Sequence, residues 1–255
     1  IKYPCGEVID KPFEFMVTSN KILVVAGDIS DNIDISLRYL DKISENYERI
    51  IFVDGNHEHV AEYPNLLSCD KINNLLKSYD NEKIIYLPKT HYKLDKTVFI
   101  GFNGWWDYDK RNKDSIKVGL RYFDEWIPSI SQSDNGTQLF IDNVIEKSEE
   151  QQNKFREMLE YYEKDNEVEN VVIISHTIPV KQFALESDGN TDTIFQLQSD
   201  SKHLVDGRYK KLKTWIFGHT HHQFDETIGS VRFISNPRGR PEDFNRVNFD
   251  LKEFK

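Results

Sequence analysis

Three histidines stand within four positions of the sequence, in the stretch GHTHHQ at residues 218–223. His219, His221 and His222 lie between an apolar run and a turn, although the whole chain has only eight histidines. Imidazole nitrogens are common ligands of borderline divalent ions such as Mn²⁺, Fe²⁺ and Zn²⁺. The crowding therefore indicates a metal site, with a polar loop that happens to be rich in histidine as the simpler alternative.

Polar side chains also follow three other apolar runs. Asp28 comes after LVVAG, Asn56 and His57 come after IFVDG, and His176 comes after VVIIS. Runs of this length, rich in β-branched residues, are typical of strands buried on both faces. Ligands of open α/β sheets bind beyond the carboxyl ends of the strands. We therefore expect these side chains to meet around one cation, with the preceding glycines allowing sharp turns.

Each of these residues also has an ordinary structural interpretation. Asp28 could cap a following helix, Asn56 could be a turn residue, and His176 could be a hydrogen-bonded histidine at a strand end. Each alternative explains one residue, whereas a shared cation explains all of them. No cysteine takes part in the pattern, so a structural zinc knuckle is not expected.

The elements that must position these residues alternate between strands and helices. Strands are predicted at 21–27, 49–55, 96–102, 170–176, 213–219 and 230–239, and helices at 34–48, 70–79 and 153–165. The helical stripes predict inward-facing Ile35, Leu37, Leu40, Ile43, Ile72, Leu75, Leu76, Phe155, Met158, Leu159 and Tyr162. This alternation predicts one α/β layered domain over residues 1–255. We interpret the polar, aromatic stretch 107–150 as an insertion or lid.

The composition is that of an acidic globular protein. The 33 Lys and Arg residues against 43 Asp and Glu residues give a net charge of −10, which argues against a broad basic surface for nucleic acid. No apolar run approaches the roughly 18 residues of a membrane span, so no membrane partner is expected. Cys5 and Cys69 form no disulfide-rich pattern, and the first residues do not look like a signal peptide. These features predict a cytoplasmic protein.

The ordered motifs GDIS, GNHEH, ISH and GHTHH resemble those of the calcineurin-like metallophosphoesterase superfamily. The stretches GFNGWWDYD and FISNPRG are similar to a bacterial and phage branch of small members, so the resemblance spans most of the chain. It implies an α/β (α+β) fold in which two β-sheets form a sandwich flanked by helices. It also implies two divalent metal ions, Mn²⁺, Fe²⁺ or Zn²⁺, at the carboxyl ends of the strands.

The resemblance further implies a role for each motif residue. Asp28 would bridge both ions, Asn56, His176 and His219 would complete one site, and His221 would belong to the other. His57 would act as a general acid or donate to the phosphoryl oxygens. A metal-bound hydroxide would then hydrolyse a phosphate monoester or diester. A small molecule, a nucleotide or a phosphoprotein could be the substrate.

Supporting roles are predicted for a few neighbouring side chains in the last third of the chain. Asp225 could accept a hydrogen bond from a ligating histidine. Arg238 and Arg240 could contact a substrate phosphate or lie in solvent. His222 is expected near the surface or behind the ligands.

Earlier in the chain, the motifs also have neighbours without a direct role. Glu58 and His59 are expected to lie behind the ligands or to be exposed. Trp105 and Trp106 could line a pocket or pack in the core. The acidic run at 146–152 is interpreted as a solvated helix face.

One family motif, Asp-x-His at the end of the first strand, has no counterpart in the sequence. Either the sequence begins downstream of that motif, or half of one metal site has been lost. We expect the first, because omitting a central strand exposes apolar area and leaves backbone groups unpaired. The second would make the chain a non-catalytic or single-metal relative that serves as a binding or scaffold module.

Overall fold

The computed structural model describes residues 22–126, 135–184, 200–239 and 249–254, in which the strands form two β-sheets. The first sheet has the order β1-β2-β3, with β1 (Ile22–Ala26), β2 (Arg49–Val53) and β3 (Ile84–Tyr86) parallel. The second has the order β4-β5-β6-β7-β9-β8, formed by β4 (Tyr92–Leu94), β5 (Thr97–Phe102), β6 (Asn170–Ser175), β7 (Leu212–Phe217), β8 (Phe224–Ile228) and β9 (Val231–Ser235). Its four inner strands are parallel, and both edge strands run antiparallel to them.

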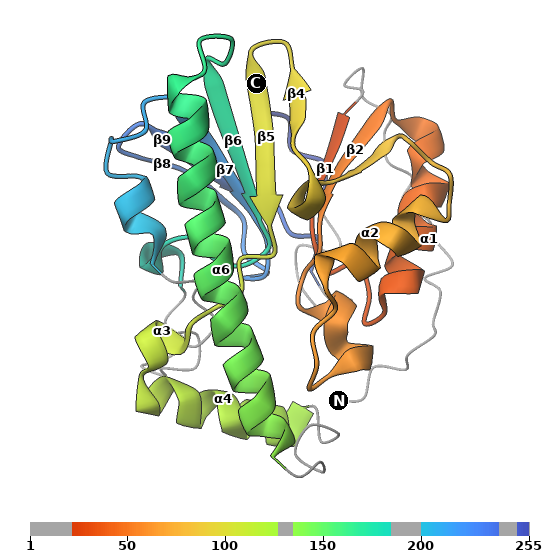
Figure 1. Ribbon diagram of the computed structural model, residues 1–255, viewed down its shortest axis with the longest axis vertical. Helices are drawn as coiled ribbons and strands as arrows, with labels where there is room; N and C mark the ends of the chain where they lie inside the picture. The colour runs from red at the N-terminus through yellow and green to blue at the C-terminus, as the bar shows by residue number, and fades with distance from the viewer. Residues whose placement is uncertain (1–21, 127–134, 185–199, 240–248, 255) are drawn as a thin grey trace.

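The two sheets face each other across an apolar layer. The buried members of this layer come from both sheets and include Ile51, Val53, Phe99, Val172, Ile174, Ile216 and Ile234. Because helices cover the outer faces, β2, β5, β6 and β7 are buried on both sides, as their continuous apolar runs predicted. The predicted two-sheet α/β sandwich flanked by helices is confirmed (Figure 1).

Helices α1 (Ile33–Ile43) and α2 (Cys69–Lys77) cover the first sheet, and the long helix α6 (Gly136–Lys164) covers the second (Figure 1). The predicted inward faces are largely confirmed, for example by Leu37, Leu40 and Phe155, each with no exposed surface. Ile35 was wrongly placed inward, since its side chain is 40% exposed. At about 100° per residue it lies almost opposite Leu37 on the helix.

An arm that follows β5 extends beyond the sheets. It consists of α3 (Tyr108–Arg111), α4 (Lys113–Trp126) and the amino-terminal half of α6, and it has its own apolar cluster. The backbone of α3 is left-handed, with φ between 53° and 61°. Helix α6 starts well before the predicted residue 153. The run at 146–152 is therefore not a purely solvated face, because Ser148 and Gln151 are buried.

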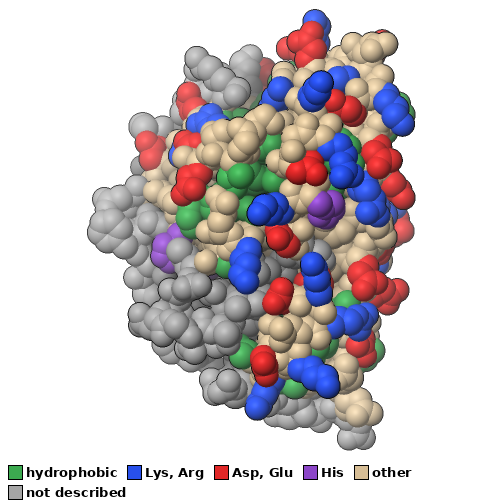
Figure 2. Space-filling view, turned by 90° about the vertical axis from the view of Figure 1, so that its left-hand side faces the viewer, with side chains coloured by type: hydrophobic (Ala, Val, Ile, Leu, Met, Phe, Trp, Pro, Cys, Tyr) green, Lys and Arg blue, Asp and Glu red, His purple; other side chains and the backbone are tan. Residues whose placement is uncertain are grey.

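Short 3₁₀ helices complete the described structure: η1 (Ser44–Asn46), η2 (His57–Glu62), η3 (Leu87–Lys89), η4 (Lys181–Phe183) and η6 (Ser201–Leu204). No helix in the described ranges is long and apolar enough to cross a membrane. On the face drawn in Figure 2, Lys and Arg side chains are interspersed with Asp and Glu side chains. No continuous basic area is visible among the described residues on that face.

Candidate metal centre

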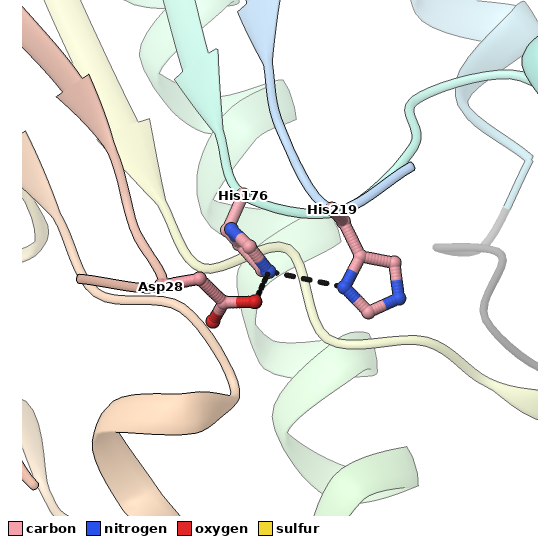
Figure 3. A group of neighbouring side chains, drawn as sticks. All are labelled: Asp28, His176 and His219. Carbon is pink, nitrogen blue, oxygen red and sulfur yellow. Dashed lines mark hydrogen bonds and ion pairs between the residues drawn. The ribbon is translucent and has the colours of Figure 1, made fainter. Parts of the chain in front are cut away.

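Four strand ends bring their polar side chains together. Asp28 and Asn56 follow the neighbouring parallel strands β1 and β2, and His176 and His219 follow the neighbouring parallel strands β6 and β7. The Nδ1 atom of His176 lies 2.7 Å from the carbonyl oxygen of Ala26, and this contact joins the two sheets at the site. Figure 3 shows the side chains of Asp28, His176 and His219 pointing toward one another.

The donor atoms of these residues lie at the spacing of ligands around one ion. The Nε2 atom of His176 is 3.0 Å from Asp28 Oδ2, 3.1 Å from Asn56 Oδ1 and 3.0 Å from His219 Nδ1. Two ligand atoms at about 2.1 Å from a cation and at right angles to each other are roughly 3.0 Å apart. The three distances are thus compatible with a divalent cation, and ligand atoms of Asp28, His176 and His219 all lie within 4.8 Å of one another.

The hydrogen bonding of His176 also favours a cation between these atoms. Its Nδ1–H donates to the carbonyl of Ala26, so its Nε2 faces the site and presents a lone pair when the ring is neutral. That lone pair meets an amide oxygen, a carboxylate oxygen and a second imidazole nitrogen. A single proton on Nε2 could serve only one of these acceptors, whereas a cation could bind all four donor atoms. The arrangement therefore has the chemistry of a metal centre.

The loop after β1 is shaped to deliver Asp28. Gly27 and Asp28 both have left-handed backbones, with φ of 76° and 56°. Consecutive amides of Asp28, Ile29 and Ser30 consequently point at the carboxylate of Glu58, with N–O distances of 2.9, 2.7 and 3.3 Å. Glu58 has no exposed surface, so of its two predicted positions it takes the one behind the ligands.

The loop after β2 approaches the same carboxylates closely. The amide of Gly55 donates to Glu58 at 2.7 Å, and the amide of His57 donates to Asp28 Oδ1 at 2.9 Å. A Cβ atom added to Gly55 would stand 2.5 Å from the backbone nitrogen of Asp28 and closer still to its carboxylate. Only glycine fits at this contact between the two loops.

The side chain of His57 is held by a second carboxylate. Its Nδ1 lies 2.5 Å from Asp31 Oδ1, and its Nε2 lies 3.9 Å from Asp28 Oδ2, on the side of the metal centre. Burial alone would lower the pKa of His57, but the charges of Asp28 and Asp31 outweigh it and raise the pKa to about 9. His57 is thus a cation at neutral pH and can donate a proton from Nε2.

Burial and neighbouring charges set opposite protonation states at the proposed ligands. Burial alone would raise the pKa of Asp28, but the imidazoles of His176 and His57 hold that pKa well below its usual range. Burial, with a further contribution from His176, lowers the pKa of His219 to about 3. Burial alone would lower the pKa of His176, but the charge of Asp28 outweighs it and raises that pKa, so a cation would displace a proton from this ring. An ionised carboxylate and a neutral imidazole are the forms that bind metal.

The turn after β7 carries two of the candidate ligands. His219 and His221 adopt left-handed backbones, with φ of 69° and 56°. His219 joins the donor cluster, and its Nε2 is buried without a hydrogen-bond partner in the described part of the chain. His221 is half-buried and close enough to affect the pKa of His219. Its assignment to a second ion remains a prediction.

The predictions for residues further along the chain had different outcomes. Asp225 is engaged elsewhere, because its carboxylate pairs with Arg232 at 2.8 Å and with Lys252 at 2.8 Å on an exposed strand. It therefore does not support the predicted contact with a ligating histidine. His222 is exposed, as expected. Arg238 is half-buried, and its contact with substrate remains a prediction, while Arg240 lies outside the described residues.

The two tryptophans of the arm are both buried, each with 2% of its surface exposed. The ring of Trp106 lies 6.0 Å from that of His219, and the ring of Trp105 meets the buried His59 edge-on at 5.0 Å. Both tryptophans are therefore packed in the core, where Trp106 contacts His219 and Trp105 contacts His59.

Asp31 and Gln151 were not predicted from the sequence to support the site. For Glu58 a place behind the ligands was one of the two predicted positions, but its partners were not predicted. Asp31 lies three residues after Asp28, and that spacing is the only local signal. Glu58 and Gln151 act on amides far away in sequence, such as Gly104, whose N–H donates to Gln151 at 2.8 Å. No pattern along the chain reveals such contacts.

This geometry agrees with what comparison with known families shows. The family model described as calcineurin-like phosphoesterase matches residues 9–223. The chain belongs to this family. Members of the calcineurin-like phosphoesterase family are metal-dependent hydrolases of phosphoesters, and the chain shares their mixed α/β fold with two sheets.

Individual relatives are distant. An uncharacterized protein of Acanthamoeba polyphaga mimivirus is 24% identical over 235 residues, which cover 89% of this chain and 81% of that protein. The crystal structure of a phosphopantetheinyl hydrolase from Mycobacterium tuberculosis superposes with a TM-score of 0.61 at 16% identity, over 89% of this chain and 82% of that one. At such identities the likeness shows a common fold.

Proposed function

We propose that this chain hydrolyses a phosphate monoester or diester at a centre of two divalent ions, Mn²⁺, Fe²⁺ or Zn²⁺. Asp28, Asn56, His176 and His219 hold one ion, and Asp28 and His221 contribute to the other. The observation that carries the proposal is the meeting of four ligand atoms from four strand ends, three of them within 3.1 Å of the fourth, the Nε2 of His176. A phosphoester that is accessible in the cytoplasm, such as a small molecule, a nucleotide or a phosphoprotein, is the substrate class we propose.

Bound cations would lower the pKa of a water molecule and neutralise charge on the phosphoryl oxygens. The protein's own residues would orient the substrate and supply a proton to it. His57 is held at Nδ1 by Asp31, so its Nε2 proton is directed toward the space beside Asp28. From there it can reach a phosphoryl oxygen or the leaving oxygen. The backbone amide of His57 fixes Asp28 Oδ1, which leaves Oδ2 toward the imidazoles.

The test is hydrolysis of p-nitrophenyl phosphate and bis-p-nitrophenyl phosphate by the purified chain with added Mn²⁺. We expect turnover that EDTA abolishes and that His57→Ala reduces by about 10²- to 10⁴-fold, the usual contribution of a general acid. The preferred ester separates a monoesterase from a diesterase.

A binding or scaffold module is the competing function, because the sequence has no Asp-x-His motif for the second ion. That function predicts Mn²⁺ binding by calorimetry without turnover of either ester, and the same His57→Ala variant would then change nothing.

A further inference from the structure

A buried polar network lies directly behind the metal centre and contains none of the proposed ligands. At its middle is Asp54, the residue after β2, which is only 3% exposed. Asp54 Oδ1 accepts a hydrogen bond from the hydroxyl of Tyr86 at 2.6 Å. Asp54 Oδ2 accepts from His59 Nε2 at 2.8 Å and from Asn103 Nδ2 at 3.3 Å. A buried carboxylate with three donors from three segments has a strongly determined position.

The first link from Asp54 closes the loop that carries Asn56 and His57. His59 Nδ1 accepts the backbone N–H of Leu67 at 2.9 Å, so the proton of the neutral ring is on Nε2 and points at Asp54. The ring cannot change tautomer without opposing the Leu67 amide. The Asp54–His59 pair therefore spans the segment between them and fixes its curvature.

The second link from Asp54 reaches the other sheet through Asn103, the residue that follows β5. The side chain of Asn103 donates to Asp54, while its carbonyl oxygen accepts the backbone N–H of His176 at 2.8 Å. The same oxygen also accepts the N–H of Thr177 at 3.0 Å. The backbone that carries His176 is therefore tied to Asp54 through a single intervening residue.

Three segments thus meet at one buried carboxyl group, because His59 belongs to the loop after β2, Tyr86 belongs to β3 and Asn103 follows β5. Through Asn103 this side chain connects the loop after β2 with the loop after β6.

We propose that Asp54 is a positioning residue of the metal centre, whose carboxylate holds the loops of Asn56 and His176 at the separation that lets both side chains bind one cation. The proposal rests on the proposed function, because it assigns those two side chains to a metal ion. Asp54 itself lies behind the site and acts only through His59 and Asn103.

The first test is Mn²⁺ affinity, measured by isothermal titration calorimetry on the folded chain. In Asp54→Asn the Oδ1 contact with Tyr86 can survive, but the new amide must face the N–H groups of His59 and Asn103. We expect the dissociation constant for Mn²⁺ to rise by about 10- to 100-fold, as is usual when the partner of a ligand loop is removed. Tyr86→Phe is the matched control, because it removes a hydrogen bond from the same carboxylate but on the side of β3, which carries no proposed ligand.

Under the proposal, Tyr86→Phe lowers thermal stability and leaves the Mn²⁺ dissociation constant close to that of the wild type. Equal Mn²⁺ affinity in Asp54→Asn and the wild type would overturn the proposal, since the network would then serve stability alone. So would equal losses of affinity in Asp54→Asn and Tyr86→Phe.

A second pair of variants decides the question if Asp54→Asn does not fold. His59→Gln and His59→Ala then replace it, because glutamine retains an N–H near the position of Nε2 and alanine does not. The proposal expects Mn²⁺ affinity to be higher in His59→Gln than in His59→Ala, and equal affinities overturn it.

If the wild type binds no Mn²⁺, the proposed function fails, and the metal-free chain still tests the network. Its ¹⁵N-histidine spectrum reports the ring of His176, which donates to Ala26 through Nδ1. The proposal expects the His176 signals to shift in Asp54→Asn and not in Tyr86→Phe. Unchanged His176 signals in Asp54→Asn overturn it.

Discussion

At the scale of single residues, the chemistry of His57 depends on its partner Asp31. The carboxylate of Asp31 fixes which ring nitrogen faces the metal centre, since it binds Nδ1 at 2.5 Å. It also contributes to the raised pKa of His57, after the larger contribution of Asp28. Asp31 therefore orients the proposed acid and also helps to keep it protonated.

Replacing Asp31 with Asn should consequently reduce turnover without reducing Mn²⁺ affinity. We expect kcat to fall by about 10- to 100-fold, which is part of the 10²- to 10⁴-fold contribution of a general acid. Steady-state kinetics with phenyl phosphate and p-nitrophenyl phosphate measure the effect. If His57 protonates the leaving oxygen, the loss is larger for the phenyl ester, because its leaving group is more basic. Equal losses would instead indicate donation to phosphoryl oxygens, and no loss with either ester would contradict the role of Asp31.

His219 should make the metal-free chain sensitive to acid. Its pKa is about 3 in the folded chain and about 6.5 when unfolded, so between these values the unfolded state binds a proton that the folded state does not. The free energy of unfolding should therefore fall as the pH drops from 6.5 toward 3, by at most about 1.4 kcal/mol per pH unit from this group. Urea unfolding of EDTA-treated protein between pH 4 and pH 7 measures the slope. In His219→Gln the slope should be shallower, and an unchanged slope would rule out this origin.

At the scale of elements, the strand ends were the part of the site that the sequence predicted best. The four donors follow apolar runs long enough to be recognised as buried strands, and parallel strands bring their carboxyl ends to one edge. Short strands such as β3 and β4, of three residues each, carry too few residues for a pattern. The start of α6 was missed because its first half packs against the other parts of the arm, and the buried side is masked by the many polar residues of this segment.

Partners set by tertiary contact could not be predicted in this way. Glu58 binds the amide of Asp28 across 30 positions, and Gln151 binds that of Gly104 across 47. The sequence placed Glu58 either behind the ligands or in solvent, and it placed Gln151 on a solvated helix face. Their true environment depends on which loops meet, and that is decided by the packing of the two sheets.

The contact between the loops after β1 and β2 predicts a severe effect of a single methyl group. In Gly55→Ala the added Cβ would overlap the backbone of Asp28, so one loop must move. Overpacking of this kind costs about 1–3 kcal/mol, and we also expect weaker Mn²⁺ binding. Urea unfolding and calorimetry measure the two effects.

Gly207→Ala is the control for that variant. It has a φ of 90°, but no atom of the described residues lies within 4 Å of an added Cβ, and its loop carries no proposed ligand. Backbone strain of about 1–2 kcal/mol should appear there without a change in Mn²⁺ affinity. If Gly55→Ala and Gly207→Ala bind Mn²⁺ equally well, the close approach of the two loops does not matter to the site.

At the scale of the whole molecule, the proposed metal centre lies across the junction of the two sheets. Asp28 and Asn56 belong to the first sheet, and His176 and His219 belong to the second. Without a cation, the direct links between the sheets at this edge include the contact of His176 with Ala26 and its contact with Asp28. A bound ion would add bonds from both sheets to one point, so binding and global stability should be coupled.

This coupling predicts that metal removal lowers the melting temperature of the entire chain. At a Mn²⁺ concentration of 100 times the dissociation constant, binding to the folded state alone adds about 2.7 kcal/mol to the free energy of unfolding. For a chain of this size that corresponds to an increase in Tm of roughly 5–10 °C, at about 2–4 °C per kcal/mol. Differential scanning calorimetry with Mn²⁺ and with EDTA measures the difference, which should grow with the logarithm of the Mn²⁺ concentration. His176→Gln removes the nitrogen that all three other donors face, so its Tm should not respond to Mn²⁺. A Tm that is independent of Mn²⁺ in the wild type would mean that no ion joins the two sheets.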